Sequence, residues 1–345
     1  MTKTLLILVK KNNVSGNYGS VKNSGLYNSS KALKAVLQSE VSVRCFIEIC
    51  VDANDIDKYL SKFKPQICLL EALWVTPEKM EEIVQLYPKV TFFTRIHSRI
   101  PFLAQEGIAI EWIKKIGKID HSYIACNNYQ THKDFKSINI PNIYMPNLYK
   151  KVNDLPGYID LFKSHFKKST SGLIVNIGGF GAIRPLKNQL LQAVAAISYA
   201  EDNNKDLYFH INGDRVELNG ESVLKNIRAL FKNTKHTLVE HPWMDHDLFM
   251  EVVSSMDICL QVSFTESFNI VAADAVYKGI PIVVSEDISW ASYESKVDAN
   301  SVEEVKEKIE SILRYPKRNI LLNKLALHKY NTESLRVWKI LLNHF

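Results

Sequence analysis

The segment SFTESFNIVAADAVYKGIPIVVS, residues 263–285, decides the fold of this chain. The apolar run just before it, residues 257–262, predicts a buried strand. Thr265 has the side chain of a helix cap, so we expect a helix from there to about Lys278. A glycine and a proline end that helix, and a second apolar strand follows. Strand, loop, helix and strand in this order form one unit of a parallel sheet.

Two carboxylates lie eight positions apart in this segment, Glu266 near the expected helix start and Asp274 within the helix. Eight residues make a little over two helical turns, so the two side chains are predicted to share one face. Backbone N–H groups also point outward at a helix start. Donors for a phosphate beside carboxylates for hydroxyl groups suit a sugar that is joined to a phosphate. The alternative is that the acids only favour the helix N-terminus and solvate its outer face.

Glycines and two cations follow another predicted strand, residues 173–177. The run GGFGAIRPLKN, residues 178–188, brings Gly179, Arg184 and Lys187 to a predicted helix start. Glycine permits close backbone approach, and cations three residues apart can both reach one diphosphate. The run is not a Walker A loop, because GxxxxGK[ST] is absent. The alternative is a pair of surface cations beside a flexible loop.

Strand-like and helix-like segments alternate through residues 4–147, which predicts a doubly wound parallel sheet. One of its strands is expected at residues 90–93, and His97 follows at the edge where open α/β sheets bind ligands. We expect His97 to hydrogen-bond a sugar or an acceptor there. Arg95 and Arg99 flank it and favour anions. The alternative is that His97 is a structural histidine whose hydrogen bonds are already satisfied.

The composition is that of a soluble globular protein, with 46% hydrophobic and 23% charged residues. A length of 345 residues is natural for two domains. No apolar run approaches the roughly 20 residues that span a bilayer, and the N-terminus lacks the pattern of a secretion signal. The five cysteines show no metal-binding spacing. We therefore expect buried free thiols and a cytoplasmic protein.

Positive charge is concentrated in the first half of the chain. Residues 1–170 contain 24 lysines and arginines against 15 acidic residues, a net charge of +9. The remainder holds 19 against 22, or −3, which gives the +6 of the whole chain. This asymmetry indicates an anionic partner for the basic half. The alternative is that the lysines only solvate exposed helix faces.

Residues 263–285 resemble the E-x7-E segment of retaining glycosyltransferases with the GT-B fold, in the large family 4 group. The matching positions are Ser263, Glu266, Phe268, Ala275, Gly279, Pro281, Val283 and Val284. Ser267 and Asn269 stand where the family has glycines, and Asp274 replaces the second glutamate. Residues 184–188 resemble the donor-phosphate element of the same family, with Arg184, Lys187 and Asn188 in register.

The resemblance implies an α/β fold of the GT-B type, with two Rossmann-like doubly wound domains that face a cleft. The parts that it implies are an acceptor-side domain over residues 1–150, a linker over 151–170, a nucleotide-sugar domain over 171–328, and a helix over 329–345 that packs back on the first domain. It also implies transfer of a hexose or pentose from a nucleotide sugar, of the UDP type, with retained anomeric configuration. No metal or other cofactor is expected.

The resemblance assigns roles to the candidate residues. Arg184 and Lys187 neutralise the leaving diphosphate, helped by N–H groups after Thr265, while Glu266 holds sugar hydroxyls. Asp274 contacts the ribose, although its side chain is one methylene shorter than glutamate. His97 acts near the sugar or the acceptor. The remaining residues expected on the donor side are Gly179, Asn188, Ser267, Phe268 and Asn269.

The sequence leaves alternatives open for the identity of the acceptor and for the type of reaction. We expect an anionic acceptor, such as a modified base in DNA, an anionic glycan or a lipid-linked saccharide. A sugar-nucleotide epimerase or a phosphorylase on the same fold is one alternative. The other is a non-catalytic protein that binds nucleotide sugars or nucleic acid.

Overall fold

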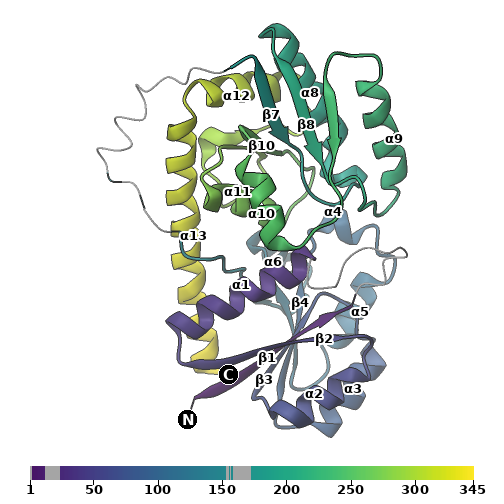
Figure 1. Cartoon of the computed structure of the whole chain (residues 1–345). Coiled ribbons are helices and arrows are strands. Elements are labelled where there is room, and N and C mark those ends of the chain that lie inside the picture. Colours follow the sequence, from purple (N-terminus) through teal and green to yellow (C-terminus); the bar gives the residue numbers. More distant parts are fainter. Residues whose placement is uncertain (1, 12–23, 153–154, 156, 158–171) are drawn as a thin grey trace. The chain divides into compact units, whose positions relative to one another are not determined.

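The computed structural model describes residues 2–11, 24–152, 155, 157 and 172–345 (Figure 1). The chain forms two compact units. One consists of Met1–Lys151 with Asn331–Phe345, and the other of Val152–Tyr330. Most of the expected linker, residues 151–170, lies outside the described residues.

The first unit is built on a parallel six-stranded sheet with the order β2-β1-β3-β4-β5-β6. Its strands are β1 (Lys3–Lys10), β2 (Val43–Cys50), β3 (Ile67–Glu71), β4 (Thr91–Ile96), β5 (Ser122–Cys126) and β6 (Ile143–Tyr144). The chain steps from β1 to β2 on one side, and β3 to β6 follow on the other. The order therefore reverses between β1 and β3, a point where open sheets bind ligands at the carboxyl ends of their strands.

Helices cover both faces of this sheet, as a parallel sheet requires. They are α1 (Gly25–Glu40), α2 (Asp55–Phe63), α3 (Pro77–Leu86), α4 (Ile100–Leu103), α5 (Ala109–Ile116) and α6 (Tyr129–Ser137). Polar side chains cap several of them; the Ser24 hydroxyl, for example, accepts from the amide of Tyr27 at 3.1 Å. Such a cap contributes about 1 kcal/mol to helix stability.

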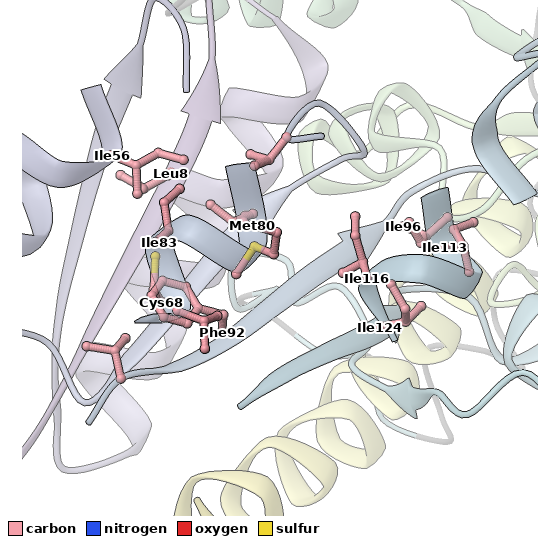
Figure 2. Close-up of a cluster of buried hydrophobic side chains, with 14 of the residues drawn as sticks. Leu8, Ile56, Cys68, Met80, Ile83, Phe92, Ile96, Ile113, Ile116 and Ile124 are labelled. Carbon is pink, nitrogen blue, oxygen red and sulfur yellow. The ribbon is translucent and has the colours of Figure 1, made fainter. Parts of the chain in front are cut away.

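Two hydrophobic cores lie on opposite faces of the sheet. Leu6 and Leu8 of β1 belong to one core, whereas Leu5 and Ile7 belong to the other, because alternate residues of a strand point to opposite faces. Figure 2 shows side chains of the first of these cores, from strands and from helices α2, α3 and α5: Leu8, Ile56, Cys68, Met80, Ile83, Phe92, Ile96, Ile113, Ile116 and Ile124. Each fully buried side chain of this size contributes about 1.5–3 kcal/mol.

The second unit repeats the architecture with the strand order β12-β11-β10-β7-β8-β9, again all parallel. Its strands are β7 (Ile174–Gly178), β8 (Asp206–Ile211), β9 (Thr237–Glu240), β10 (Ile258–Gln261), β11 (Ile282–Ser285) and β12 (Lys296–Val297). Its helices are α8 (Gln189–Asp202), α9 (Gly220–Phe231), α10 (His246–Ser254), α11 (Ile270–Lys278) and α12 (Val302–Arg314), with the short 3-10 turns η2 (Pro185–Lys187) and η3 (Tyr293–Ser295). Here the order reverses between β7 and β10. The prediction of two doubly wound α/β domains is confirmed.

The last helix, α13 (Pro316–His344), contributes to both units, because the division between them falls at Tyr330. Its final turns are anchored in the first unit. The indole N–H of Trp338 donates to the carbonyl of Pro146 at 2.8 Å, and Oδ1 of Asn331 accepts from the amide of Tyr149 at 2.9 Å.

Two expectations from composition can be compared with the structure. The prediction of buried free thiols is confirmed, because all five cysteines are buried and unpaired. Burial raises the pKa of Cys45, Cys50 and Cys126 to about 12, so these thiols stay protonated at neutral pH. Within the described ranges, no helix is both long enough and apolar enough to cross a membrane.

Candidate active site

Two loops meet where the strand order of the second unit reverses. One, residues 179–188, follows β7, and the other, residues 262–269, follows β10. The amide of Phe264 donates to the carbonyl of Leu186 at 3.0 Å and joins the two loops. Both motif-bearing segments of the second unit therefore lie side by side, at the edge of the sheet that favours ligand binding.

Lys187 and Glu266 form an ion pair between these loops. Their side chains are only 12% and 9% exposed. Desolvation by burial lowers the pKa of Lys187; Glu266 opposes that shift, and the positive charge of Arg184 adds to it. The structure thus brings together the three residues that the sequence assigned to a sugar and its diphosphate.

Arg184 faces a second carboxylate, Glu217, with 3.7 Å between Nη1 and Oε2. Nε of Arg215 donates to Oε1 of the same glutamate at 2.5 Å, and the Arg215 guanidinium lies 4.3 Å from the ring centroid of Trp243. Glu217 is therefore a shared partner of two arginines, whereas the ion-pair partner of Lys187 is Glu266. Three cations gather at this edge of the sheet.

Helix α11 begins later than the sequence predicts. Its cap is Asn269, whose Oδ1 accepts from the amide of Ala272 at 2.9 Å. Asn269 has a φ of 60°, a left-handed conformation that a continuous right-handed helix does not contain. The prediction that Thr265 caps the helix is therefore wrong, and Glu266 lies in the preceding loop and not on a helix face shared with Asp274.

The backbone donors also differ from the prediction. The amide of Glu266, the first after Thr265, is not free, because it donates to Oδ2 of Asp287 at 2.9 Å. The donors that lack a partner inside α11 are those of its first turn, at Ile270 and Val271. The amides that an anion could reach at this helix end therefore lie four to five residues further along the chain than the amides predicted after Thr265.

Asp274 lies inside α11 and is only 1% exposed. Nε2 of His246, the first residue of α10, is 3.1 Å from each of its carboxylate oxygens. The expectation that Asp274 contacts a ribose directly is corrected, because His246 covers the carboxylate.

Phe268 and Asn269 are both expected on the donor side, but their side chains hold the second loop in place. The Phe268 ring packs against the rings of Trp290 and Tyr330, with centroids 5.8 and 5.4 Å away. Asn269 caps α11 with its oxygen, and its Nδ2 donates to Oε1 of Gln261 at 2.9 Å. Both residues are buried, so neither presents its side chain to a ligand.

The side chain of Asn188 holds the first loop in place in the same way. Nδ2 of Asn188 donates to the carbonyls of Val262 and Ala299 at 3.1 and 2.8 Å. A Cβ on Gly179 would lie 2.7 Å from the ring of Phe209, so glycine is needed there for packing against β8. Asn188 therefore shapes the loop around Lys187, and the close backbone approach expected at Gly179 stays a prediction.

Two hydroxyl groups of the second loop are buried and make no hydrogen bond within the described part of the chain. They belong to Ser263 and Thr265, which are 1% and 7% exposed. A buried polar group without a partner costs about 1–3 kcal/mol, and such groups in a native protein point to a missing partner. Ser267, by contrast, is partly exposed beside Glu266 and remains a candidate for donor contact.

In the first unit, His97 follows β4 and is held by two neighbours. Nε2 hydrogen-bonds the carboxylate of Glu71 at the end of β3, and Nδ1 lies 3.1 Å from Nδ2 of Asn127. Because a carboxylate only accepts, Nε2 carries the proton and Nδ1 accepts from Asn127. Burial lowers the pKa of His97 despite the opposing charge of Glu71. Both ring nitrogens are used, which favours the alternative of a structural histidine.

Arg95 is not available to an anion, which corrects the prediction for this residue. Its side chain is fully buried, Nη1 lies 3.1 and 3.2 Å from the carboxylate oxygens of Glu71, and Nη2 donates to Oδ1 of Asn147 at 2.5 Å. Burial would raise the pKa of Glu71, but Arg95 and His97 together hold it below its ordinary value. Arg99 is partly exposed at the start of α4 and stays a candidate on the acceptor side.

Solved structures share this architecture over the whole chain. Sucrose-phosphate synthase from Thermosynechococcus elongatus matches with a TM-score of 0.64 and 12% identity, over 100% of this chain and 99% of that one. The fold is GT-B. A UDP-forming α,α-trehalose-phosphate synthase from Burkholderia xenovorans gives a TM-score of 0.61 at 11% identity, over 100% and 98% of the two chains. Anabaena HepE in complex with UDP and glucose gives 0.61 at 9% identity, over 98% of each. No protein-family model and no curated protein sequence matches the chain.

The residues that sequence reasoning missed are the partners of the predicted ones. Glu217, His246 and Asp287 contact Arg184, Asp274 and the amide of Glu266. None lies in a recognisable motif. One signal was available for two of them, because His246 and Asp287 come shortly after predicted strands, on the edge where open α/β sheets bind ligands.

Proposed function

We propose that this chain is a glycosyltransferase that takes a sugar from a nucleotide-sugar donor. The observation that carries the proposal is the buried ion pair between Lys187 and Glu266 with Arg184 beside it, at the point where the strand order reverses. A cation and a carboxylate side by side match the two ends of a sugar diphosphate. The phosphate takes the cation, and the sugar hydroxyls take the carboxylate.

The diphosphate is the leaving group, and its negative charge grows as the bond to the sugar breaks. We propose that Lys187 and Arg184 stabilise that charge and that the amides of Ile270 and Val271, in the first turn of α11, add donors. Loss of one such donor typically lowers kcat by a factor of about 100–1,000. Because two cations and a helix end supply the positive charge, we propose that no metal is needed.

Glu266 has two roles in this scheme. Without a donor, its carboxylate neutralises the buried ammonium of Lys187. When the diphosphate binds Lys187, the carboxylate becomes free to accept hydrogen bonds from sugar hydroxyls. The resemblance of residues 263–285 to retaining enzymes supports transfer with retained anomeric configuration, of a hexose or pentose from a UDP-sugar.

We propose an anionic acceptor that binds the first unit. Residues 1–170 carry a net charge of +9, and Arg99 is partly exposed after β4 on the ligand-binding edge. An anionic or lipid-linked saccharide fits this charge, and a modified base in DNA is the alternative. A salt-sensitive mobility shift with duplex DNA, absent with a neutral saccharide, identifies the DNA acceptor.

The first experiment is a thermal-shift panel of UDP, GDP, ADP and their common sugar conjugates. We expect one nucleotide and its sugar conjugate to raise Tm, because a ligand that binds only the folded state stabilises it. Lys187→Ala abolishes the shift, and Lys235→Ala, in an ion pair whose two side chains are 46% and 54% exposed, retains it. Incubation of the donor without acceptor then separates a transferase from an epimerase, which converts the donor alone.

A further inference from the structure

Asp274 and His246 form a pair that the proposed roles do not use. The carboxylate of Asp274 is buried in α11, and Nε2 of His246 is equidistant from its two oxygens, at 3.1 Å. The His246 side chain is 10% exposed. Its other ring nitrogen, Nδ1, makes no hydrogen bond with any described residue and is not fully buried. The pair therefore presents one free nitrogen at the surface of the unit.

The chemistry of that nitrogen follows from its partner. An ionised carboxylate only accepts hydrogen bonds, so Nε2 of His246 carries a proton and donates to Asp274. In the neutral ring, Nδ1 is then an acceptor with its lone pair directed away from Asp274. A nitrogen in this state binds a hydroxyl or N–H donor, not a phosphate.

The position of the pair is next to the proposed phosphate site. His246 opens α10 just after β9, on the carboxyl edge of the sheet, and α10 packs against α11. Phe249 of α10 lies 5.4 Å from the ring of Phe180 in the glycine-bearing loop after β7. Asp274 is the fifth residue of α11, about 6 Å along the axis from the free amides of its first turn. A group joined to the diphosphate by one ester oxygen reaches this far.

We propose that Nδ1 of His246 accepts a hydrogen bond from a ribose hydroxyl of the donor nucleotide, and that Asp274 is a positioning residue that fixes the tautomer and orientation of the ring. The inference rests on the proposed function, because it takes the ligand to be a nucleotide. It assigns the ribose contact to a residue outside the helix that carries the carboxylate. Asp274 accepts a hydrogen bond from His246, and His246 in turn accepts one from the ribose hydroxyl.

The test compares ribose with deoxyribose forms of the nucleotide. Calorimetry measures the affinity of the full-length protein for the nucleotide that binds best in the thermal-shift panel, for its 2′-deoxy and 3′-deoxy forms, and for pyrophosphate. The wild type should bind at least one deoxy form about three- to tenfold more weakly, the usual effect of one hydrogen bond. His246→Ala should abolish this preference, Asp274→Asn should weaken it, and both variants should bind pyrophosphate as the wild type does.

The outcomes separate the two proposals. If the wild type binds a nucleotide and His246→Ala retains the preference for ribose, or if the wild type shows no preference, the inference is overturned and the proposed function stands. If the variants lose pyrophosphate binding together with nucleotide binding, His246 supports the fold of the site and does not contact ribose. If the wild type binds no nucleotide or nucleotide sugar, the proposed function fails and this inference with it.

Discussion

Lys187 and Glu266 are each about nine-tenths buried and neutralise one another across two loops that follow different strands. Removing either partner from a buried pair leaves an uncompensated charge, which is costly. A diphosphate can replace Glu266 as the partner of Lys187, because it brings negative charge to the same ammonium. The ion pair is therefore both the resting state of the proposed site and a competitor of its ligand.

Glu266→Gln should separate these two roles. Without the competing carboxylate, the affinity for the free nucleoside diphosphate should rise at least about threefold, because the ammonium of Lys187 no longer has to leave a buried carboxylate partner. Turnover of the nucleotide sugar should fall more than tenfold, because the acceptor for its hydroxyls is weakened. Calorimetry and an assay of diphosphate release measure the two effects. Glu310→Gln, in a half-exposed ion pair with Arg314, is the control. A fall in nucleoside diphosphate affinity that parallels the fall in turnover would contradict the competition.

Thr265→Val should reveal a ligand contact without disturbing the fold. The Thr265 hydroxyl is buried and has no hydrogen-bond partner in the ranges that the structure covers. Replacing it with a methyl group of the same shape should leave the free energy of unfolding unchanged or raise it by up to about 1 kcal/mol. Donor affinity should fall, because the hydroxyl gains its hydrogen-bond partner from the donor. A destabilisation beyond about 1 kcal/mol, measured by urea unfolding, means that the hydroxyl is already paired in the free protein.

Arg95→Met should destabilise the first unit rather than weaken acceptor binding alone. The change leaves Glu71 buried with only His97 as a charged partner, and breaking a buried pair in this way typically costs about 3–5 kcal/mol. Lys115→Ala, which removes an exposed pair with Glu111, should cost less than about 0.5 kcal/mol. Urea unfolding of both variants measures the difference. Equal stability of Arg95→Met and the wild type would restore Arg95 as a candidate for anion binding.

His210 should make the second unit sensitive to mild acid. Burial and the nearby His241 lower the pKa of His210 to about 4, from an ordinary value of 6.5. Nε2 of His210 lies 3.2 Å from Oδ1 of Asn176 and Nδ1 lies 2.9 Å from Nε2 of His241, so the neutral ring is fully bonded. Between pH 6.5 and 4, this histidine is protonated in the unfolded chain but stays neutral in the folded chain. The free energy of unfolding therefore falls as the pH falls through this window.

The measurement for His210 is the free energy of unfolding at several pH values between 7 and 4. The wild type should lose more stability over this range than His210→Gln, which has no titrating ring. Parallel curves for the two proteins would show that His210 is protonated as easily in the folded chain as in the unfolded one.

The sequence predicts the layers of this protein better than the details of its site. Alternating apolar runs are enough to predict two parallel sheets, because strand and helix periods differ and the connections are short. The start of α11 is missed because Thr265 and Asn269 are both good capping residues, and only the left-handed backbone of Asn269 decides between them.

The partner network could not be predicted for a different reason. His246 and Asp274 are 28 positions apart and Lys187 and Glu266 are 79 apart, so their pairing depends on the order of strands in the sheet. The motif predicts that Lys187 and Glu266 serve one ligand. The motif does not indicate that these two residues form an ion pair. Nor does the sequence around Arg95 indicate that its side chain is buried in the core.

Sugar transfer by Lys187→Ala and Glu266→Ala tests the central claim most directly. The donor found in the thermal-shift panel is incubated with wild type, each variant and the Lys235→Ala control, and release of the nucleoside diphosphate is followed, with folding checked by circular dichroism. We predict a rate more than tenfold lower in both variants, an unchanged rate in the control, and native spectra throughout. Turnover close to that of the wild type in both folded variants would show that this pair is not the donor site and would contradict the account.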